Sequence, residues 1–568
     1  MPTPPRLNDL LSGLDRRRFL ELSGVASAAA IAGFGTISGA PAQSARAAAR
    51  ARFSAYPFTL GVSSGDPLPD GVVLWTRLAP DPLNGGGMPT NAVDVHWQVA
   101  EDAGFRTVVK SGTTKAHPEL AHSVHVEVSG LRPAREYHYR FSAGGEISPA
   151  GRTRTAPSAT STPAAFSFVF ASCQQWEHGY FTAYRHIAEE DVDLIVHLGD
   201  YIYEYAPGGY TAPSGMVRRH HGAKPMDLAG YRTRHAQYNT DPDLRAARAH
   251  APWLVTWDDH EVENNYADAH SEYGQGATAF LKRRAAAYQA YYEHMPVRKS
   301  SVPHGPYARM YRGLSYGRLL DFSVLDTRQY RDRQAQNDRF PQGPNKERSE
   351  KSRTIMGTAQ EKWLINRMAA SGARWNVIAN QTLFSQLDVK PGKGREYSAD
   401  SWDGYPANRK RITDALAAHR VRNPVVITGD AHVSYASDVK ADYDDPDSTT
   451  LGVEFLGTSI SSDGDGADHA RDSADILKAN PHIKFFSDFR GYVRCHADAS
   501  GFQADYRLVP VVSKHGASVH TRASYRTEDG KPGLVHAGGS AIPAGETNKK
   551  VAKDYWIVKP SARTNPGK

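Results

Sequence analysis

The stretch DVDLIVHLGDYIYEY, residues 191–205, begins as an apolar run of strand length and ends in a Gly-Asp pair among aromatic and acidic side chains. A continuous apolar run is typical of a strand buried on both faces, as in an α/β sheet that helices cover. Polar groups directly after such a strand lie at its carboxyl end, where the ligands of α/β proteins gather. The stretch therefore predicts an α/β fold with a binding site at the end of this strand.

Five more apolar runs of strand length continue this rhythm, separated by segments of helical character such as TAQEKWLINRMAAS. Strands and helices in alternation predict sheets flanked by helices, and we expect them to form one catalytic domain over residues 166–536. The five runs are FSFVFASC (166–173), PWLVTWDD (252–259), RLLDFSVLD (318–326), RWNVIANQT (374–382) and NPVVITGD (423–430).

The segment before this domain has a different pattern. Residues 53–155 contain short alternating strands such as VDVHWQVA and REYHYRFSA, which predict a β-sandwich of the fibronectin or immunoglobulin type. A G-x-S-x-G motif at 61–65 is followed by GDPLPDG rather than a helix, so we expect a turn there and no catalytic serine. The Pro-, Ser- and Thr-rich residues 156–165 read as a linker, and residues 537–568 as a C-terminal tail.

The first 42 residues are predicted to be an export signal. Arg16, Arg17 and Arg18 precede a Gly- and Ala-rich apolar segment that ends in Ala-Pro-Ala, which is typical of twin-arginine signals. We therefore expect a secreted, soluble protein that engages the twin-arginine export machinery and has no transmembrane segment.

Composition narrows the class of protein further. The chain has 568 residues, of which 40% are hydrophobic and 23% charged, so it is long enough for two or three folded domains. Without residues 1–42 the net charge falls from +7 to +6, which suits an anionic substrate. We expect a monomer without a stable nucleic-acid partner. Two cysteines, Cys173 and Cys495, are too few for a disulfide scaffold, and form either one bridge or two free thiols.

Polar side chains follow five of the predicted strands at the point where each strand ends. Burying many such groups together is costly unless cations pair with them. Each residue alone has an ordinary structural role, such as a helix cap or a core side chain, but their repetition at five strand ends favours a metal site. The residues are Cys173, Asp200, Tyr203, the DDHE run at 258–261, Asn380, Gln381, Asp430 and His432.

The G-D-x-x-Y spacing is the most specific element. A carboxylate and a phenol three residues apart, Asp200 and Tyr203, can turn toward the same point at the start of a helical turn. A hard trivalent cation such as Fe(III) stabilises a phenolate, so Asp200 can bridge two metal ions while Tyr203 binds one.

A series of motifs resembles the PhoD-type alkaline phosphatases and phosphodiesterases, relatives of the purple acid phosphatases and of a secreted iron-containing phospholipase D. The motifs are, in order, FASCQQW, GDYIYEY, TWDDHEVENN, RTIMGTAQEKWL, NQTLFSQ, WDGYPANR and ITGDAHVS. The resemblance implies a two-sheet metallophosphoesterase core with Fe(III) and Ca(II), preceded by a β domain.

The resemblance also implies ligands. By analogy with the purple phosphatases, iron is held by Cys173, Asp200, Tyr203 and His432. Calcium, which prefers oxygen ligands, is held by Asp200, Asp259, Asp430 and an amide from Asn380 or Gln381. Cys173 and Asp430 stand where the purple phosphatases have Asp and His, which favours calcium over zinc at the second position. A ligand role for Cys173 implies that the two cysteines are not bridged.

The implied function is that of a secreted, metal-dependent phosphoesterase that hydrolyses phosphate mono- and diesters by attack of a metal-held hydroxide. His260 would stabilise the transition state or protonate the leaving oxygen. Arg409, after WDGYPAN, would clamp the phosphate, with a surface salt bridge as its alternative role. Two other functions remain open: a phosphodiesterase of phospholipase D type acting on phospholipid head groups or teichoic acid, and a non-catalytic surface binding protein.

Overall fold

The computed structural model describes residues 53–390 and 392–551. The predicted export signal, residues 1–42, lies outside the described residues, as do residues 552–568 of the predicted tail. None of the helices in the described part of the chain has the length and apolar character needed to cross a membrane.

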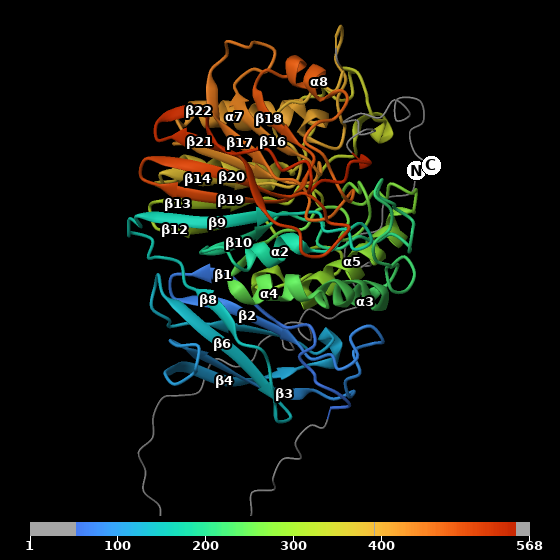
Figure 1. The fold of residues 1–568 in the computed structure, drawn as a ribbon, viewed down its shortest axis with the longest axis vertical. Coiled ribbons are helices and arrows are strands. Elements are labelled where there is room, and N and C mark those ends of the chain that lie inside the picture. The colour runs from blue at the N-terminus through green and yellow to red at the C-terminus, as the bar shows by residue number, and fades with distance from the viewer. Residues whose placement is uncertain (1–52, 391, 552–568) are drawn as a thin grey trace, which may run out of the picture.

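Two large sheets form the body of the protein (Figure 1). The ten-stranded sheet has the order β22 (Lys531–Gly538), β21 (His520–Glu528), β20 (Gly501–Val509), β19 (Arg490–Asp498), β9 (Ala165–Ala171), β10 (Leu194–His197), β11 (Trp253–Val255), β1 (Val62–Leu68), β2 (Gly71–Arg77) and β5 (Ser123–Val128). The seven-stranded sheet has the order β12 (Arg312–Tyr316), β13 (Leu320–Val324), β14 (Trp375–Ala379), β15 (Pro424–Thr428), β17 (Thr450–Leu456), β16 (Ser434–Lys440) and β18 (Ile483–Ser487).

The two sheets share one apolar core, which contains Phe168 of β9, Phe322 of β13 and Phe455 of β17. The six predicted apolar runs are confirmed as β9, β10, β11, β13, β14 and β15. Within each sheet these strands pair in parallel, so their carboxyl ends reach the same edge. This arrangement places the polar residues that follow them close together.

Helices cover the outer faces of the sheets. In Figure 1 the helices α3, α4 and α5 lie between the strands β9 and β10 of the ten-stranded sheet and the N-terminal strands β3, β4 and β6, while α6 and α7 pack against β14 and β15 through Leu364 and Ile412. The helices are α2 (Thr182–Ile187), α3 (Leu228–Asn239), α4 (Pro242–His250), α5 (Ala277–His294), α6 (Thr358–Ala370), α7 (Pro406–Ala418) and α8 (Ser473–Ala479), with short 3₁₀ turns η2 (Pro118–Leu120), η3 (Lys299–Ser301), η4 (Ala335–Asp338) and η5 (Trp402–Gly404).

The N-terminal β domain continues the ten-stranded sheet instead of standing apart from it. Its second layer consists of β4 (Val108–Ala116), β3 (Val93–Ala100), β6 (Glu136–Ala143) and β7 (Glu146–Ile147), with β8 (Gly151–Arg154) also on β6. Its first layer joins the catalytic strands where Gly65 of β1 pairs with Trp253 of β11. A Cβ at Gly65 would lie 2.2 Å from the carbonyl oxygen of Pro296, so only glycine allows this approach. The expected turn at 61–65 is therefore wrong, because residues 62–65 lie on a strand.

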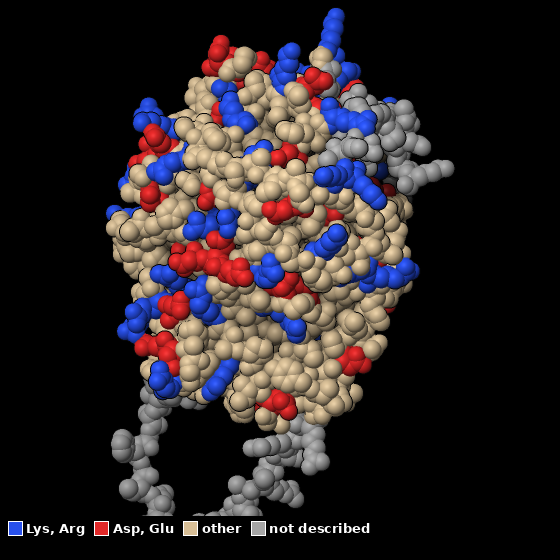
Figure 2. All heavy atoms as spheres, viewed as in Figure 1, with Lys and Arg blue, Asp and Glu red and all other residues tan. Residues whose placement is uncertain are grey.

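The surface carries charges of both signs. On the face shown in Figure 2, Lys and Arg side chains alternate with Asp and Glu over both the catalytic and the N-terminal parts. Exposed ion pairs occur on the surface, such as Lys115 with Asp94 at 2.7 Å. On this face the positive net charge is spread out and forms no single basic patch.

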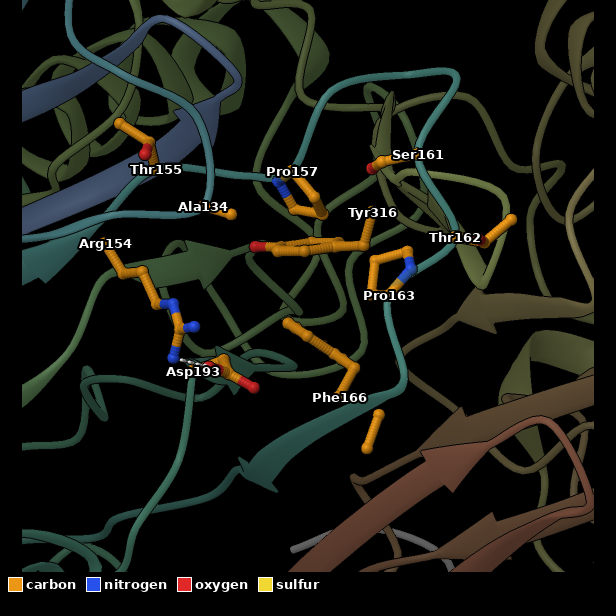
Figure 3. Close-up of a pocket in the computed structure, with 11 residues that line it drawn as sticks. Ala134, Arg154, Thr155, Pro157, Ser161, Thr162, Pro163, Phe166, Asp193 and Tyr316 are labelled. Carbon is orange, nitrogen blue, oxygen red and sulfur yellow. Dashed lines mark hydrogen bonds and ion pairs between the residues drawn. The ribbon is translucent and has the colours of Figure 1, made fainter.

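The segment predicted as a linker is packed against the catalytic domain. The backbone N–H of Arg318 donates to the carbonyl oxygen of Ser161 at 2.8 Å. Pro157 and Pro163 line a cavity of about 210 Å³ together with the rings of Phe166 and Tyr316 (Figure 3). These contacts hold the residues between the two domains in place.

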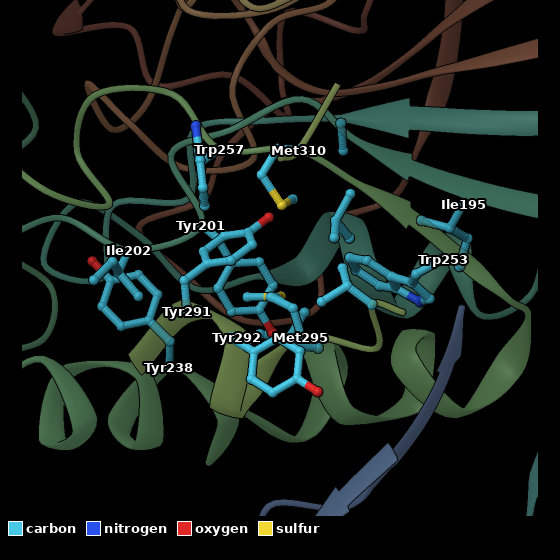
Figure 4. Packing of buried hydrophobic residues seen from close by; sticks show 14 of the residues in the cluster. Ile195, Tyr201, Ile202, Tyr238, Trp253, Trp257, Tyr291, Tyr292, Met295 and Met310 are labelled. Carbon is cyan, nitrogen blue, oxygen red and sulfur yellow. The ribbon is translucent and has the colours of Figure 1, made fainter. Parts of the chain in front are cut away.

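An aromatic core lies beside β10, whose Ile195 belongs to it (Figure 4). The ring of Tyr201 lies in the same buried cluster as Trp253, Tyr291 and Met295. Because Tyr201 directly follows Asp200, this packing anchors the loop that carries the Asp200 carboxylate.

Next to this core, His235 of α3 is a buried histidine with neither ring nitrogen hydrogen-bonded among the described residues. Burial and then the charges of Arg248, Arg77 and Arg234 lower its pKa to about 3. The unfolded chain takes up a proton near pH 6.5 whereas the folded chain stays neutral, so stability is lost as the pH falls through this window. We expect His235 alone to cost about 2 kcal/mol of unfolding free energy between pH 7.5 and 5.

Denaturant unfolding at pH 7.5 and pH 5 measures this effect. The variant His235→Phe keeps a flat ring beside His294 and Tyr201, and should lose less stability at pH 5 than the parent protein. The control is the same substitution at His96, which is exposed on β3. Equal pH dependence in the parent and in His235→Phe would contradict the prediction.

Candidate metal centre

The loops after the parallel strands bring three overlapping groups of ligand atoms together. Within each group the ligand atoms lie within 4.8 Å of one another. Asp200 and Asp259 each belong to two groups, so the three groups form one continuous cluster at the edge shared by the sheets. The groups are Cys173 with Asp200 and His432, Asp200 with Asp259 and His260, and Asp258 with Asp259 and Asp430.

Tyr203 joins the first of these groups. Its hydroxyl donates to Oδ2 of Asp200 at 2.8 Å and lies 3.0 Å from Nε2 of His432. Tyr203 is fully buried, and the G-D-x-x-Y turn brings the phenol and the carboxylate to the same point, as the spacing predicts.

The backbone is strained at four of these positions. The φ angle is +60° at Cys173, +57° at Asp200, +66° at Asp430 and +58° at His432. Positive φ angles are uncommon for residues other than glycine, cost free energy, and cluster at functional sites. The strained backbone is therefore associated with four residues that contribute side chains to the cluster.

One further carboxylate ties two of the loops together. Glu261 is fully buried and accepts backbone N–H bonds from Asp200 at 3.2 Å, Tyr201 at 2.6 Å and Asp258 at 2.8 Å. A Cβ at Gly199 would lie 2.4 Å from Cβ of Asp258, so glycine is needed where the loops approach. Glu261 and Gly199 thus fix the spacing between Asp200 and Asp258.

The donor set fits metal ions. Oδ1 of Asp200 and Oδ1 of Asp259 are buried without a hydrogen-bond partner among the described residues, which is costly for a carboxylate. Burial raises the pKa of the Asp200 and Asp430 carboxyls and of the Cys173 thiol well above their usual ranges. Bound cations would give these oxygens a partner and stabilise the ionised forms.

Arg328 supplies a positive charge to the same cluster. Its buried guanidinium contacts the carboxylate of Asp258, lies 3.7 Å from Oδ1 of Asp259, and makes two bonds of 2.8 Å to Asp400. Arg328 follows β13, two residues beyond the run RLLDFSVLD that predicts this strand. It therefore adds a cation at a sixth strand end.

Two carboxylates orient the histidines of the cluster. Nδ1 of His260 donates to Glu204 at 2.8 Å, and Nδ1 of His432 donates to Asp463 at 2.9 Å. A carboxylate at Nδ1 fixes the tautomer and leaves Nε2 for the site. Glu204 lies within the opening GDYIYEY motif, whereas Asp463 lies in a loop after β17 for which no motif gives a signal.

Comparisons with known proteins decide the family. Residues 168–506 match the family model of PhoD-like phosphatases, and residues 42–157 match the model of their N-terminal domain. The chain belongs to the PhoD-like phosphatase family. Alkaline phosphatase D of Bacillus subtilis strain 168 is 53% identical over 506 residues, which are 89% of this chain and 87% of the relative. A solved structure of PhoD has 53% identity and a TM-score of 0.86, over 88% of this chain and 95% of its own.

Family membership confirms the resemblance and the α/β fold with a β-rich N-terminal domain. As a PhoD-like phosphatase the protein is a phosphoesterase, which leaves no support for a non-catalytic binding protein. The two cysteines of this PhoD-like phosphatase are both buried and free, as a ligand role for Cys173 requires.

Three predicted residues of this PhoD-like phosphatase form hydrogen bonds with groups outside the cluster. Gln381 accepts a hydrogen bond from Thr327 at 2.7 Å and donates to Leu325 and Thr256, so both ends of its amide are engaged elsewhere. Asn380 donates to the Thr382 carbonyl and accepts from Trp402 at 3.2 Å. The guanidinium of Arg409 is likewise engaged by other residues.

Arg409 lies on α7 and is buried. Its guanidinium is 2.8 Å from Oδ1 of Asp403 and donates to the carbonyl oxygen of Phe384 at 3.1 Å. Because these two partners engage its guanidinium, the described contacts give no support to a phosphate clamp at Arg409. It is a buried structural ion pair instead of the exposed salt bridge named as its alternative.

Proposed function

We propose that this PhoD-like phosphatase hydrolyses phosphate mono- and diesters at a centre that holds Fe(III) and Ca(II). The observation that carries the proposal is the overlap of three ligand groups at Asp200 and Asp259, with one buried oxygen on each carboxylate that has no hydrogen bond among the described residues. A shared carboxylate with a free oxygen is suited to bridging two cations.

The donor types divide between two kinds of cation. Cys173, Asp200, Tyr203 and His432 offer sulfur, phenol, imidazole and carboxylate donors, which suit iron. Asp200, Asp259 and Asp430 offer oxygens alone, which suit calcium. Of the two amides, Asn380 is the better further ligand, because its carbonyl oxygen has only one long hydrogen bond, whereas the amide of Gln381 is fully engaged.

Bound in this centre, the cations would supply Lewis acidity, which draws charge from phosphate oxygens and activates water. His260, held through Nδ1 by Glu204, keeps a proton at Nε2 and gives it to the leaving oxygen. Burial lowers the pKa of His260, but the carboxylates of Asp259, Asp200 and Glu204 outweigh this and raise it well above 6.5. Arg328 offsets part of the negative charge of Asp258 and Asp259, and so lowers the repulsion toward an anionic substrate.

Elemental analysis with a visible spectrum tests the metal assignment. We expect iron and calcium in the purified protein, and a visible band from Tyr203 or Cys173 bound to Fe(III). A calcium chelator should then abolish most of the turnover while the band stays, because the iron ligands, which include a thiolate and a phenolate, hold iron without calcium. Full activity in a colourless, iron-free protein would refute the assignment.

Parallel assays decide the substrate class. We expect hydrolysis of nitrophenyl phosphate and of its bis-ester, as for a phosphatase that accepts mono- and diesters. A clear preference for phosphatidylcholine would instead favour the alternative of a phospholipase D type phosphodiesterase.

We also propose export by the twin-arginine route, which residues 16–18 and the following apolar segment support. Replacing Arg16 and Arg17 by Lys should keep the protein inside the cell. Sedimentation of the exported protein tests the expected monomer.

A further inference from the structure

Ser462 lies inside the metal centre although it is no metal ligand. It follows β17, is fully buried, and its Oγ is 2.7 Å from the Tyr203 hydroxyl oxygen and 2.8 Å from the carbonyl oxygen of Cys173. The same Oγ accepts the backbone N–H of Gln175 at 3.1 Å. One serine side chain therefore touches the backbone or side chain of two proposed iron ligands.

The position of this hydroxyl is fixed by the backbone of Ser462. The Ser462 carbonyl oxygen accepts from Arg490 at 2.9 Å and from Oγ of Ser459 at 2.8 Å. Because the residue is held through these bonds, its hydroxyl keeps the same distance to Tyr203 whichever acceptor takes its hydrogen.

The hydroxyl has one hydrogen and two acceptors in reach. The Cys173 carbonyl also lies near the backbone N–H groups of Ser461 at 3.4 Å and Ser462 at 3.3 Å, so it keeps other donors when the hydroxyl turns away. A tyrosine that binds a cation as phenolate has no hydrogen of its own and carries negative charge. Hydrogen bonds to charged acceptors are about twice as strong as neutral ones. The Ser462 hydroxyl therefore donates to the phenolate and not to the Cys173 carbonyl.

We propose that Ser462 is a positioning residue that tunes the iron through Tyr203. In the loaded protein its hydroxyl donates to the Tyr203 oxygen, which weakens the electron donation of the phenolate to Fe(III). Hydrogen bonds to ligand atoms are a known means by which proteins set the properties of a metal. The inference rests on the proposed iron site and deepens it, since it names the residue that sets the colour and reduction potential of that site.

The variant Ser462→Ala tests this inference, with Ser461→Ala as a matched control. Ser461 is the neighbouring residue and equally buried, but its Oγ donates to the Gln175 carbonyl at 2.8 Å. Without the hydrogen bond the phenolate donates more strongly, so Ser462→Ala should move the visible band to longer wavelength and lower the reduction potential. Ser461→Ala should leave both as in the parent.

Iron content is measured in all three proteins, which separates loss of tuning from loss of metal. Equal iron content with an unshifted band in Ser462→Ala would overturn the inference. A second measurement needs no variant: the phenolate C–O stretch in the resonance Raman spectrum of the parent should shift after exchange into D₂O, and an unchanged frequency counts against the hydrogen bond. A colourless parent would refute the iron assignment itself, and the inference with it.

Discussion

Asp200→Asn is expected to abolish turnover and at the same time to make the metal-free protein harder to unfold. Asp200 belongs to two of the three ligand groups, so an amide at this position weakens both proposed cation sites. Losing an outer partner of a metal site costs about 10–100-fold in activity. For a shared ligand we expect a loss of kcat on the order of 10⁴-fold, which exceeds that range.

The gain in stability follows from the charge of the empty site. Burial raises the pKa of the Asp200 carboxyl, and the metal-free protein therefore loses stability as the pH rises from the unfolded pKa through the folded one. Above both values, a neutral amide of the same shape removes this penalty. By analogy with other replacements of buried charges, we expect a gain of about 1–4 kcal/mol at pH 8.

Denaturant unfolding of the chelator-treated proteins measures the change in stability. The kcat of the metal-loaded proteins measures the loss of turnover. Asp94→Asn is the control, because Asp94 is 59% exposed and pairs only with Lys115 at the surface. If the metal-free Asp200→Asn protein were less stable than the parent, the account of Asp200 as a strained ligand with one unsatisfied buried oxygen would be wrong.

His260→Asn is expected to lower kcat by about 10²–10⁴-fold, the range for loss of a general acid or base. Iron and calcium content should stay as in the parent, since the proposed ligands are other residues. Glu204→Gln should lower kcat by about 10–100-fold, the range for an outer partner, because Glu204 orients His260 through Nδ1.

The double variant tests whether the two residues act together. When Glu204 acts only through His260, changing both should cost no more than changing His260 alone. Additive losses would show a separate role for Glu204. Loss of iron from His260→Asn would instead place the imidazole among the ligands.

The strands and the edge that carries the chemistry could be predicted from the sequence, because buried parallel strands leave long apolar runs with polar residues at their ends. Cys173, Asp200 and Asp430 follow such runs directly. The two-residue spacing from Asp430 to His432 and the three-residue spacing from Asp200 to Tyr203 keep each pair on one loop. Local sequence therefore contained most of the proposed ligands.

Residues that act through long-range contacts could not be found in this way. Ser462 and Asp463 meet Tyr203 and His432 only because β17 lies beside β15 in the seven-stranded sheet. Their own segment, TSISSDGDG, has no spacing typical of a site. Only the three-dimensional arrangement assigns them to the centre.

The contacts that Asn380, Gln381 and Arg409 form have local causes. Asn380 and Gln381 are neighbours at the end of β14, and neighbouring side chains of an extended chain point in opposite directions, so sequence alone does not say which one faces the centre. Arg409 meets Asp403 because η5 and α7 follow each other directly. The motif WDGYPANR thus holds an ion pair within itself.

The position of β19 affects how the protein folds during its synthesis. β9, the first strand of the catalytic core, is bonded on one side to β10 and on the other to β19, where Phe170 pairs with Val493. When Cys173 and Asp200 have left the ribosome, the residues of β19 must still be translated before they can cover the open edge of β9. The sheet beside the centre therefore closes only after nearly the whole catalytic domain has been synthesised.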